Sequence, residues 1–249
     1  MIPKTKAKPI ITINDLHKSF GKNHVLDGFN LHLYEGENLV VMGKSGSGKS
    51  VMIKCLIGLE EFDRGKIIIM DKDVSHINQE ELDEIRTEVG FLFQGSALYD
   101  SMSVRENLEF PLRRHTKKFG EIEDTTPMVM EALRSVGLES TINLMPNELS
   151  GGMKRRIALA RTLILQPKII LYDEPTTGLD PITSKEIILL MKSIQDKYKT
   201  SSIIITHDID CARVIANRMI LLIDGINYAE GTFEALASSK DPKIEAFFK

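Results

Sequence analysis

The chain has 249 residues, of which 42% are hydrophobic and 27% charged, and its formal net charge is −3. This balance argues against nonspecific nucleic-acid binding, which requires a clear excess of Lys and Arg, so we expect no nucleic-acid partner. Two cysteines, Cys55 and Cys211, are too few for a disulfide scaffold and fit a reducing compartment. No apolar run approaches the roughly 20 residues that cross a bilayer, so we expect any membrane role to need a partner.

Short apolar strands alternate with helical segments along most of the chain, which predicts an α/β fold with a parallel core sheet. The opening segments 10–20 and 29–43 alternate apolar and polar residues, as half-buried antiparallel strands do. Further strands are expected at 38–43, 66–70, 89–94, 168–175, 201–208 and 218–224. Helices are expected at 49–59 and 182–198, through most of 103–165, and after residue 231.

The segment "GKSGSGKS" satisfies the pattern G-x-x-x-x-G-K-[ST] between a strand and a helix, the context that this phosphate-binding motif requires. Its glycines let backbone N–H groups turn toward a phosphate, and the dipole of the following helix adds to the attraction. Lys49 can reach the β- and γ-phosphates, and the Ser50 hydroxyl can hold Mg²⁺. The predicted nucleotide contacts are Gly43, Lys44, Ser45, Gly46, Ser47, Gly48, Lys49 and Ser50. The alternative is a glycine-rich turn with a chance lysine.

Polar residues follow three of the predicted apolar strands. Asp173 and Glu174 end one strand, and adjacent buried carboxylates are costly unless they face a site. Asp173 would orient Mg²⁺ through water, and Glu174 would accept a proton from the attacking water. His207 and Gln94 follow two other strands at the edge where ligands gather in parallel sheets. His207 could reach a γ-phosphate, and Gln94 could ligate Mg²⁺ or position water. The alternatives are a solvated acidic turn, a structural histidine and a plain polar strand end.

A second phosphate-binding turn, "LSGGM" at 149–153, precedes another helix. Together the motifs resemble those of the ABC-transporter ATPase family, in the family's order, over about 10–231. "GKSGSGKS" is similar to its Walker A loop, "LSGGM" to its signature, and "IILYDE" to its Walker B strand with catalytic Glu174. "GLD" at 178–180 is similar to its D-loop, and His207 to its switch histidine. The resemblance implies the ABC ATPase fold, with ATP and Mg²⁺ as cofactors.

The resemblance also implies a head-to-tail homodimer with two ATP molecules between the subunits. Ser150, Gly151 and Gly152 of one copy would then cap the γ-phosphate that Lys49 of the other copy holds, because N–H groups at a helix start attract anions. Phe20 matches the aromatic residue that stacks on adenine in this family, where tyrosine is commoner. A core aromatic is the alternative for Phe20.

These motifs predict one ABC ATPase domain over 1–249, since no Pro/Gly/Ser-rich linker divides the chain. Within it we expect a nucleotide-binding core at 10–94 and 166–231, a helical subdomain at 95–165 and a helical tail at 232–249. The tail would be a packing helix, or else a regulatory or dimer contact. The basic residues at 154–156 are expected on a solvated helix face.

The stretch 91–114 resembles the corresponding part of the ATPases of MCE-associated lipid transporters, the phospholipid-trafficking systems that maintain outer-membrane asymmetry. Residues 97–102 are close to the pattern of that branch, and Met153 agrees, because the branch often has methionine where most family members have glutamine. The departures are Gly95 and Ser96 before Ala97, and Tyr99 where phenylalanine is frequent. The resemblance implies phospholipid transport from the cytoplasmic face of the inner membrane, with an integral membrane permease and an MCE-domain protein as candidate partners.

Leu98 and Tyr99 form an apolar and aromatic stretch suited to grip a helix of a permease. The alternative is that both side chains pack inside the helical insertion. At the level of function, the alternatives are an ABC ATPase for another substrate, a soluble ABC ATPase of translation or DNA repair, and a P-loop small-molecule kinase. The soluble proteins usually carry two cassettes or a long insertion, and a kinase has no use for "LSGG".

Overall fold

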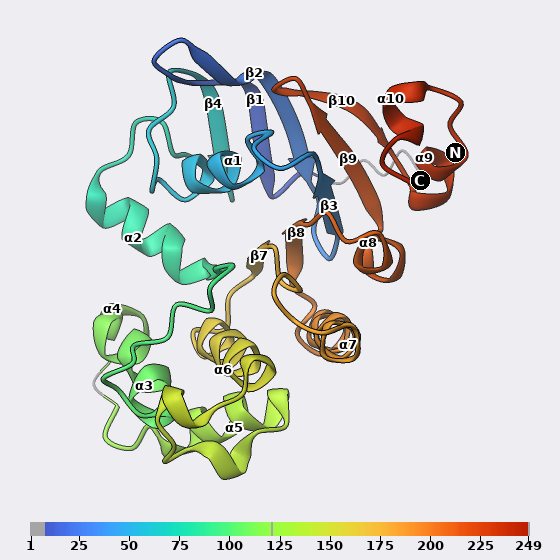
Figure 1. The fold of residues 1–249 in the computed structure, drawn as a ribbon. Coiled ribbons are helices and arrows are strands. Elements are labelled where there is room, and N and C mark those ends of the chain that lie inside the picture. Colours follow the sequence, from blue (N-terminus) through green and yellow to red (C-terminus); the bar gives the residue numbers. More distant parts are fainter. Residues whose placement is uncertain (1–7, 121, 249) are drawn as a thin grey trace.

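The computed structural model of the chain describes residues 8–120 and 122–248. Figure 1 shows a strand-rich part, helices along it, and a cluster of helices at the end away from the antiparallel strands. Four strands form the antiparallel sheet, in the order β2-β1-β4-β5. Their bounds are β1 (Ile11–Phe20), β2 (Asn23–Leu33), β4 (Arg64–Ile69) and β5 (Lys72–Asp73). The prediction of antiparallel pairing is confirmed for 10–20 and 29–33, since β1 pairs with β2 and β4, but it is wrong for 38–42, which belongs to the other sheet and pairs in parallel.

The second sheet has six strands in the order β10-β9-β3-β8-β7-β6, and all neighbours are parallel except β9 and β10. Its strands are β3 (Asn38–Met42), β6 (Val89–Leu92), β7 (Ile169–Asp173), β8 (Ser201–Ile205), β9 (Arg218–Ile223) and β10 (Ile226–Gly231). The predicted parallel core sheet is therefore confirmed. Because the strands run in the same direction, the segments that follow β3, β6, β7 and β8 meet at one edge.

Both faces of the sheet are buried at β3, β7, β8 and β9, and alternate residues of these strands belong to two different hydrophobic clusters. Leu39 and Val41 of β3 face the cluster that includes β1, β2 and β4. Val40 and Met42 face the cluster that includes the helical layer. This explains why the core strands are continuously apolar while the antiparallel strands alternate.

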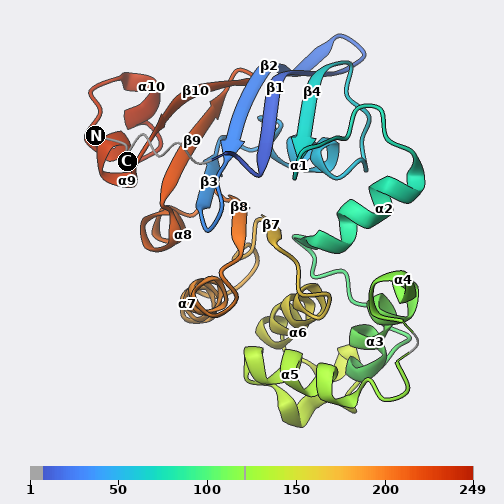
Figure 2. The same ribbon diagram turned by 180° about the vertical axis from the view of Figure 1, so that it is seen from behind.

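The helical segment contains α3 (Val104–Arg114), α4 (Thr116–Phe119), α5 (Thr126–Val136) and α6 (Gly151–Leu163), with 3₁₀ turns η1 (Glu139–Thr141) and η2 (Pro146–Glu148). A capping box between Ser103 and Glu106 starts α3, and left-handed Gly137 ends α5. Figure 2 shows these helices gathered on the side of the parallel sheet away from β1 and β2. Helix α6 joins them to the sheet, because its buried apolar residues belong to the same cluster as Ile170 and Tyr172 of β7.

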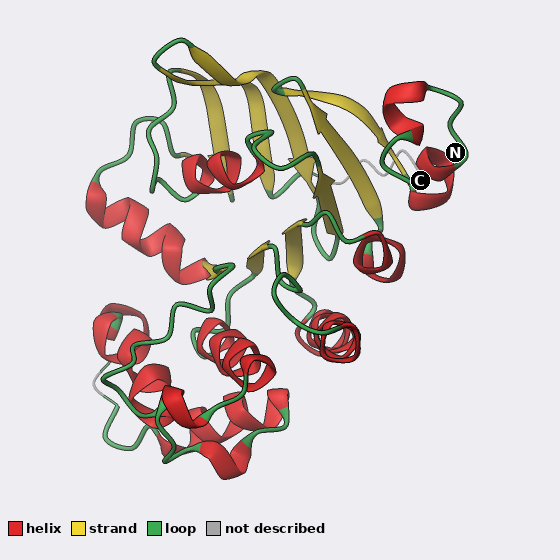
Figure 3. Ribbon diagram, viewed as in Figure 1, coloured by secondary structure: helices red, strands yellow, loops and turns green. Residues whose placement is uncertain are grey.

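The remaining helices are α1 (Lys49–Leu56), α2 (Gln79–Glu88), α7 (Pro181–Tyr198), α8 (Ile209–Ile215), α9 (Phe233–Ala237) and α10 (Pro242–Glu245) (Figure 3). Helix α1 ends before the predicted residue 59, because Gly58 follows with a φ of 65°. Sequence analysis missed α2, α8 and β10, although Asn78 and Glu81 form a capping box that signals the start of α2. Within the described ranges, no helix has the length and hydrophobicity needed to cross a bilayer.

Candidate nucleotide site

The phosphate loop connects β3 to α1 and depends on its glycines. A Cβ on Gly43 would lie 2.4 Å from Ser47 Oγ and 2.7 Å from the carbonyl oxygen of Leu222. Gly48 has a φ of 100°, and a Cβ there would lie 2.8 Å from Val25 Cγ1. Any other residue at these two positions would clash or be strained. The motif therefore sets the shape of the loop as well as its chemistry.

Lys49 lies at the start of α1 with its ammonium group inside the loop. Its Nζ donates to the carbonyl oxygens of Gly43 at 2.8 Å and Lys44 at 3.1 Å. Burial lowers the pKa of Lys49, although the nearby carboxylates of Glu174 and Asp173 oppose this change. The side chain is thus a desolvated cation, and its attraction for an anion is stronger than it would be in water.

Ser50 and Asp173 come together from α1 and β7. Ser50 Oγ donates to Asp173 Oδ1 at 2.9 Å. Burial raises the pKa of Asp173 above its ordinary value, the hydrogen bond from Ser50 opposes the rise, and the charge of Glu174 adds to it. A hydroxyl and a carboxylate that lie together where negative charge is costly are the hard oxygen donors that Mg²⁺ prefers.

Glu174 follows β7 with a φ of 51°, in the left-handed region that residues other than glycine rarely adopt. Its Oε2 accepts a hydrogen bond from Thr177 Oγ1 at 3.2 Å and lies 2.8 Å from Nδ1 of His207. Its Oε1 lies 4.0 Å from Lys49 Nζ. The carboxylate is thereby held at the edge of the sheet in one orientation. Sequence analysis missed Thr177.

A cavity of about 780 Å³ opens at this edge, and most of the predicted residues border it. Those that line it are Phe20, Gly43, Lys44, Ser45, Gly46, Gly48, Lys49, Ser50, Gln94, Glu174 and His207. Sequence analysis missed the other lining residues, Val25, Met42, Val51, Ala246 and Phe247. A volume of this size is typical of small-molecule sites.

Phe20, Ser47 and Asp173 differ in how they are placed relative to this cavity. Phe20 is 48% exposed and lines the cavity, so its alternative assignment as a core aromatic is wrong. Ser47 does not line the cavity, because its side chain packs against Gly43, and only its backbone remains a candidate phosphate contact. Asp173 does not line the cavity either, but it accepts a hydrogen bond from Ser50, which does.

The predicted second phosphate-binding turn lies at the N-terminus of α6. Ser150 caps this helix, and its Oγ accepts a hydrogen bond from the backbone N–H of Met153 at 3.2 Å. Ser150 and Gly151 are exposed. Ser150, Gly151 and Gly152 are not among the described residues that line the cavity of the same chain.

The glycines of this turn pack against the segment that precedes α7 and against the first turn of α7. A Cβ on Gly152 would lie 2.6 Å from Thr183 Cγ2, so the close approach of α6 and α7 requires glycine there. A Cβ on Gly151 would lie 3.8 Å from Leu179 Cδ2, within the predicted D-loop. The two family motifs, 149–153 and 178–180, are thus neighbours in space.

The family model for ABC transporters matches residues 26–177, more than half of the chain. The chain belongs to the ABC transporter family. It is an ATP-binding cassette, and both the predicted fold and the predicted family are confirmed.

Curated relatives of this cassette differ in what their names say they transport. Mkl of Mycobacterium tuberculosis, a probable ribonucleotide transport ATP-binding protein, is 42% identical over 95% of this chain and 66% of its own length. MetN of Clostridium tetani, a methionine import ATP-binding protein, is 41% identical over 87% of this chain and 67% of its own. MlaF of Haemophilus influenzae, from an intermembrane phospholipid transport system, is 36% identical over 96% and 90%. The chain thus spans about two thirds of the first two relatives.

A solved structure shares the fold of the cassette. The ATP-binding cassette MJ0796, in a dimeric post-hydrolysis state bound to ADP and Pi, is similar with a TM-score of 0.80 and 34% sequence identity. The similarity covers 90% of this chain and 98% of that chain. This supports the assignment of the cassette as an ATPase that binds adenine nucleotides.

The burial of Arg155 shows that the prediction of a solvated basic face at 154–156 is wrong for this residue. It is only 4% exposed, and burial lowers its pKa. Its guanidinium donates to the carbonyl oxygens of Phe93 at 2.8 Å and Thr177 at 3.3 Å. Among the described residues, its Nε has no hydrogen-bond partner. Arg155 therefore links the signature helix to the segments beside Gln94 and Glu174, which periodicity alone did not reveal.

Replacing Arg155 by alanine is expected to lower the free energy of unfolding by about 2 kcal/mol or more, because two carbonyl oxygens lose their donors. Urea denaturation of the full chain would measure this change. Lys154→Ala, on the same helix, is the matched control and should stay close to wild type. Equal stability of Arg155→Ala and wild type would show that water replaces the guanidinium.

Leu98 and Tyr99, which were predicted to contact a permease together, differ in burial. Leu98 is partly buried and packs against the cluster of the helical layer, as its alternative assignment proposed. Tyr99 is 43% exposed, and its ring lies 4.9 Å from that of Phe110. Asn107 fixes the backbone here by accepting from the Tyr99 N–H at 2.9 Å. Tyr99 is therefore the more exposed of the two and the better candidate for contact with another protein.

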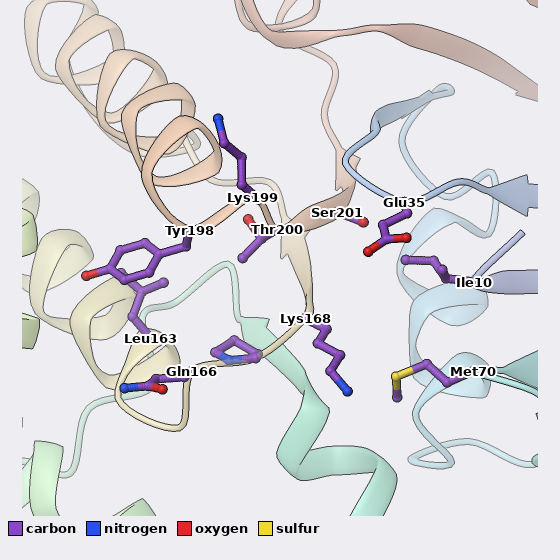
Figure 4. A pocket seen from close by; sticks show the side chains of 11 residues that line it. Ile10, Glu35, Met70, Leu163, Gln166, Lys168, Tyr198, Lys199, Thr200 and Ser201 are labelled. Carbon is purple, nitrogen blue, oxygen red and sulfur yellow. The ribbon is translucent and has the colours of Figure 1, made fainter. Parts of the chain in front are cut away.

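A second cavity, of about 690 Å³, lies at the amino ends of β7 and β8, opposite the edge that carries the predicted site. Figure 4 shows Lys168, Lys199, Thr200 and Ser201 around it, with Glu35 on the facing side. None of the residues predicted to bind nucleotide lines it. It lies at the amino ends of the strands, whereas the phosphate loop lies at their carboxyl ends, so the two sites are separate.

Proposed function

We propose that this chain is the ATP-hydrolysing subunit of a transporter, in which two copies close around two ATP molecules and drive lipid transport through a membrane permease. One observation carries the catalytic part of the proposal. The phosphate loop, the Ser50–Asp173 pair and the Glu174–His207 pair converge on one cavity at one edge of the sheet.

In the proposed reaction, water attacks the γ-phosphorus of ATP and ADP leaves with the electrons of the broken P–O bond. Glu174 takes the proton from the attacking water, and the 2.8 Å contact with His207 orients its carboxylate. Lys49 neutralises charge on the β- and γ-phosphates. Backbone N–H groups of the loop hold the phosphates before and during the reaction.

The donors around Ser50 fit Mg²⁺. Ser50 Oγ and Asp173 Oδ1 supply two hard oxygens 2.9 Å apart, and Gln94 lines the same cavity with an amide oxygen. The raised pKa of Asp173 indicates that a cation would relieve the cost of its buried charge. When bound, Mg²⁺ would neutralise charge on the phosphates.

The exposed signature turn supports a head-to-tail dimer. Ser150, Gly151 and Gly152 present the N-terminus of a 13-residue helix, where N–H groups and the helix dipole attract anions. They do not line the cavity of their own chain. The phosphate that they would bind therefore belongs to an ATP molecule held in the cavity of a second copy. The dimeric state of MJ0796 agrees with this assembly.

Phospholipid is the proposed substrate, on the resemblance of 97–102 and Met153 to lipid-transporter ATPases and on the similarity to MlaF over 90% of its length. Methionine import is a second candidate, because MetN is 41% identical. We further propose that the chain binds a permease, together with an MCE-domain protein, at the cytoplasmic face of the inner membrane.

The test is purification of the tagged chain from detergent-solubilised membranes, with mass spectrometry of the proteins and lipids that accompany it. A permease, an MCE-domain protein and bound phospholipid are the expected companions. A permease without the MCE-domain protein and without lipid, in a complex whose ATPase activity responds to methionine, would favour the second candidate. Absence of any membrane protein would contradict the transport proposal.

Tyr99→Ala is expected to leave basal ATP hydrolysis unchanged and to reduce recovery of the permease complex, because the exposed ring contributes contact area. Tyr99→Phe should retain the complex. Leu59→Ala, at another exposed apolar position, is the matched control. Leu98→Ala should instead lower stability, by about 1–2 kcal/mol, since its side chain is partly buried in the same chain. Full assembly of Tyr99→Ala would exclude the ring from the interface.

A further inference from the structure

The C-terminal tail reaches the cavity that the phosphate loop borders. Ala246 and Phe247, which follow α10, line this cavity together with Phe20 and Val25. The predicted motifs account for the loop, the carboxylates and the histidine, but no motif includes residues this close to the end of the chain. The tail was expected only to pack, regulate or form a dimer contact.

Several contacts hold the tail in place. Tyr228 Oη donates to Asp241 Oδ2 at 2.8 Å, which ties the start of α10 to β10. The rings of Phe233 and Phe248 lie edge to face with centroids 5.5 Å apart. Ile244 is buried in the cluster of the helical layer. Figures 1 and 2 show α9 and α10 beside β10 from both sides, so the tail is a packed part of the fold.

The turn between β9 and β10 connects the tail to the cavity wall. Lys243 Nζ of α10 donates to Asp224 Oδ2 in this turn at 3.0 Å. The next residue, Gly225, accepts a hydrogen bond from the Asp27 N–H at 3.0 Å, and a Cβ there would lie 3.2 Å from the carbonyl oxygen of Val25. A continuous series of contacts therefore links the tail to this turn and the turn to the start of β2.

Val25 completes the connection to the phosphate loop. A Cβ on Gly48 would lie 2.8 Å from Val25 Cγ1, so this side chain packs directly on the loop. The cavity thus has a polar part, made by the loop and Lys49, and an apolar part to which Phe20, Val25 and Phe247 contribute. ATP has the same division, with charged phosphates at one end and a flat, weakly polar base at the other.

We propose that Phe247 contacts the base of bound ATP, which makes the C-terminal tail part of the nucleotide site. This inference rests on the nucleotide site proposed above. An aromatic ring suits the role, because every base offers a flat π-face for stacking. Phe20 and Phe247 would then both contribute to base binding, and an exposed Phe20 would not be the sole apolar contact.

The test measures the affinity of the full chain for ATP and for inorganic tripolyphosphate, both with Mg²⁺, by titration calorimetry. Phe247→Ala is expected to weaken ATP binding by about tenfold, while tripolyphosphate, which has no base, binds as in wild type. Ile226→Ala, an exposed apolar change on the neighbouring strand β10, should change neither affinity. The unfolding temperature of each variant is measured alongside.

An unchanged ATP affinity in Phe247→Ala would overturn the proposal, and so would equal weakening of ATP and tripolyphosphate, because the residue would then act through the loop. If Phe247→Ala fails to fold, Phe247→Leu decides. It keeps an apolar side chain without the flat ring, and a loss of a few-fold is expected for ATP alone. Wild-type affinity of this variant for both ligands would contradict a stacked ring.

Lys49→Ala separates this inference from the proposed site. It should weaken ATP and tripolyphosphate together, because both ligands carry the phosphates that Lys49 would bind. If Lys49→Ala binds both ligands as wild type does, the nucleotide site itself is wrong. If Lys49→Ala behaves as expected and Phe247→Ala binds ATP normally, only the role of the tail fails.

Discussion

Glu174→Gln is expected to bind ATP normally and to hydrolyse it roughly 10²- to 10⁴-fold more slowly than wild type, the range typical of losing a general base. Glutamine has nearly the same shape and can still accept from Thr177 Oγ1 and contact His207 Nδ1. It cannot accept the proton of the attacking water. The change should therefore affect the chemical step without disturbing the loop that holds the phosphates.

Release of inorganic phosphate measures the rate, and gel filtration with ATP measures the assembly. Because ATP would remain intact, the variant should accumulate as a dimer when ATP is present. Glu61→Gln, which replaces an exposed carboxylate by a carboxamide, is the matched control and should hydrolyse ATP at the wild-type rate. A monomeric and fully active Glu174→Gln would remove this residue from the role of base.

Lys49→Ala is expected to weaken ATP binding by about 10²-fold or more, because a desolvated ammonium group no longer meets the phosphates. Burial lowers the pKa of Lys49, so the fold holds the charged form at a cost. Gly43 and Lys44 line the cavity, so water can replace the ammonium group at their carbonyl oxygens, and the unfolding temperature should change little. Loss of binding without loss of stability would distinguish a functional lysine from a structural one.

Calorimetric titration with ATP and thermal denaturation measure the two effects separately. Lys192→Ala, an exposed lysine change on α7, is the control for the loss of one positive charge. Wild-type ATP affinity in Lys49→Ala would overturn the assignment of the loop. A large fall in unfolding temperature would show that the hydrogen bonds to Gly43 and Lys44 matter chiefly for folding.

Two of the predicted elements illustrate what local sequence encodes. The strand is continuously apolar over 169–172 because both faces of a parallel sheet are buried, and this pattern is visible without any knowledge of its neighbours. The glycines of the phosphate loop are equally local, since Gly48 takes a backbone conformation that other residues avoid. Such features depend on backbone sterics and on the periodicity of apolar residues, and both can be recognised in a short window of sequence.

Other features depended on which element packs against which. Arg155 belongs to a run of three basic residues, and only the approach of Phe93 and Thr177 buries it. Leu98 and Tyr99 are adjacent and both apolar or aromatic, yet one packs inward and the other remains exposed. In each case the environment of the side chain comes from residues distant in the chain, so no window around it carries the information.

The sequence alone determined the α/β class, the phosphate loop, the two carboxylates at the end of β7 and the family, because each of these depends on residue types at fixed short spacings. The tertiary structure decided that His207 lies 2.8 Å from Glu174, that Ser50 meets Asp173, and that Phe247 reaches the cavity. The first two contacts join residues 33 and 123 positions apart, and Phe247 lies far along the chain from the phosphate loop at 43–50. Contacts over such separations form only when the strands and helices have packed, and they are set by the whole arrangement of the core.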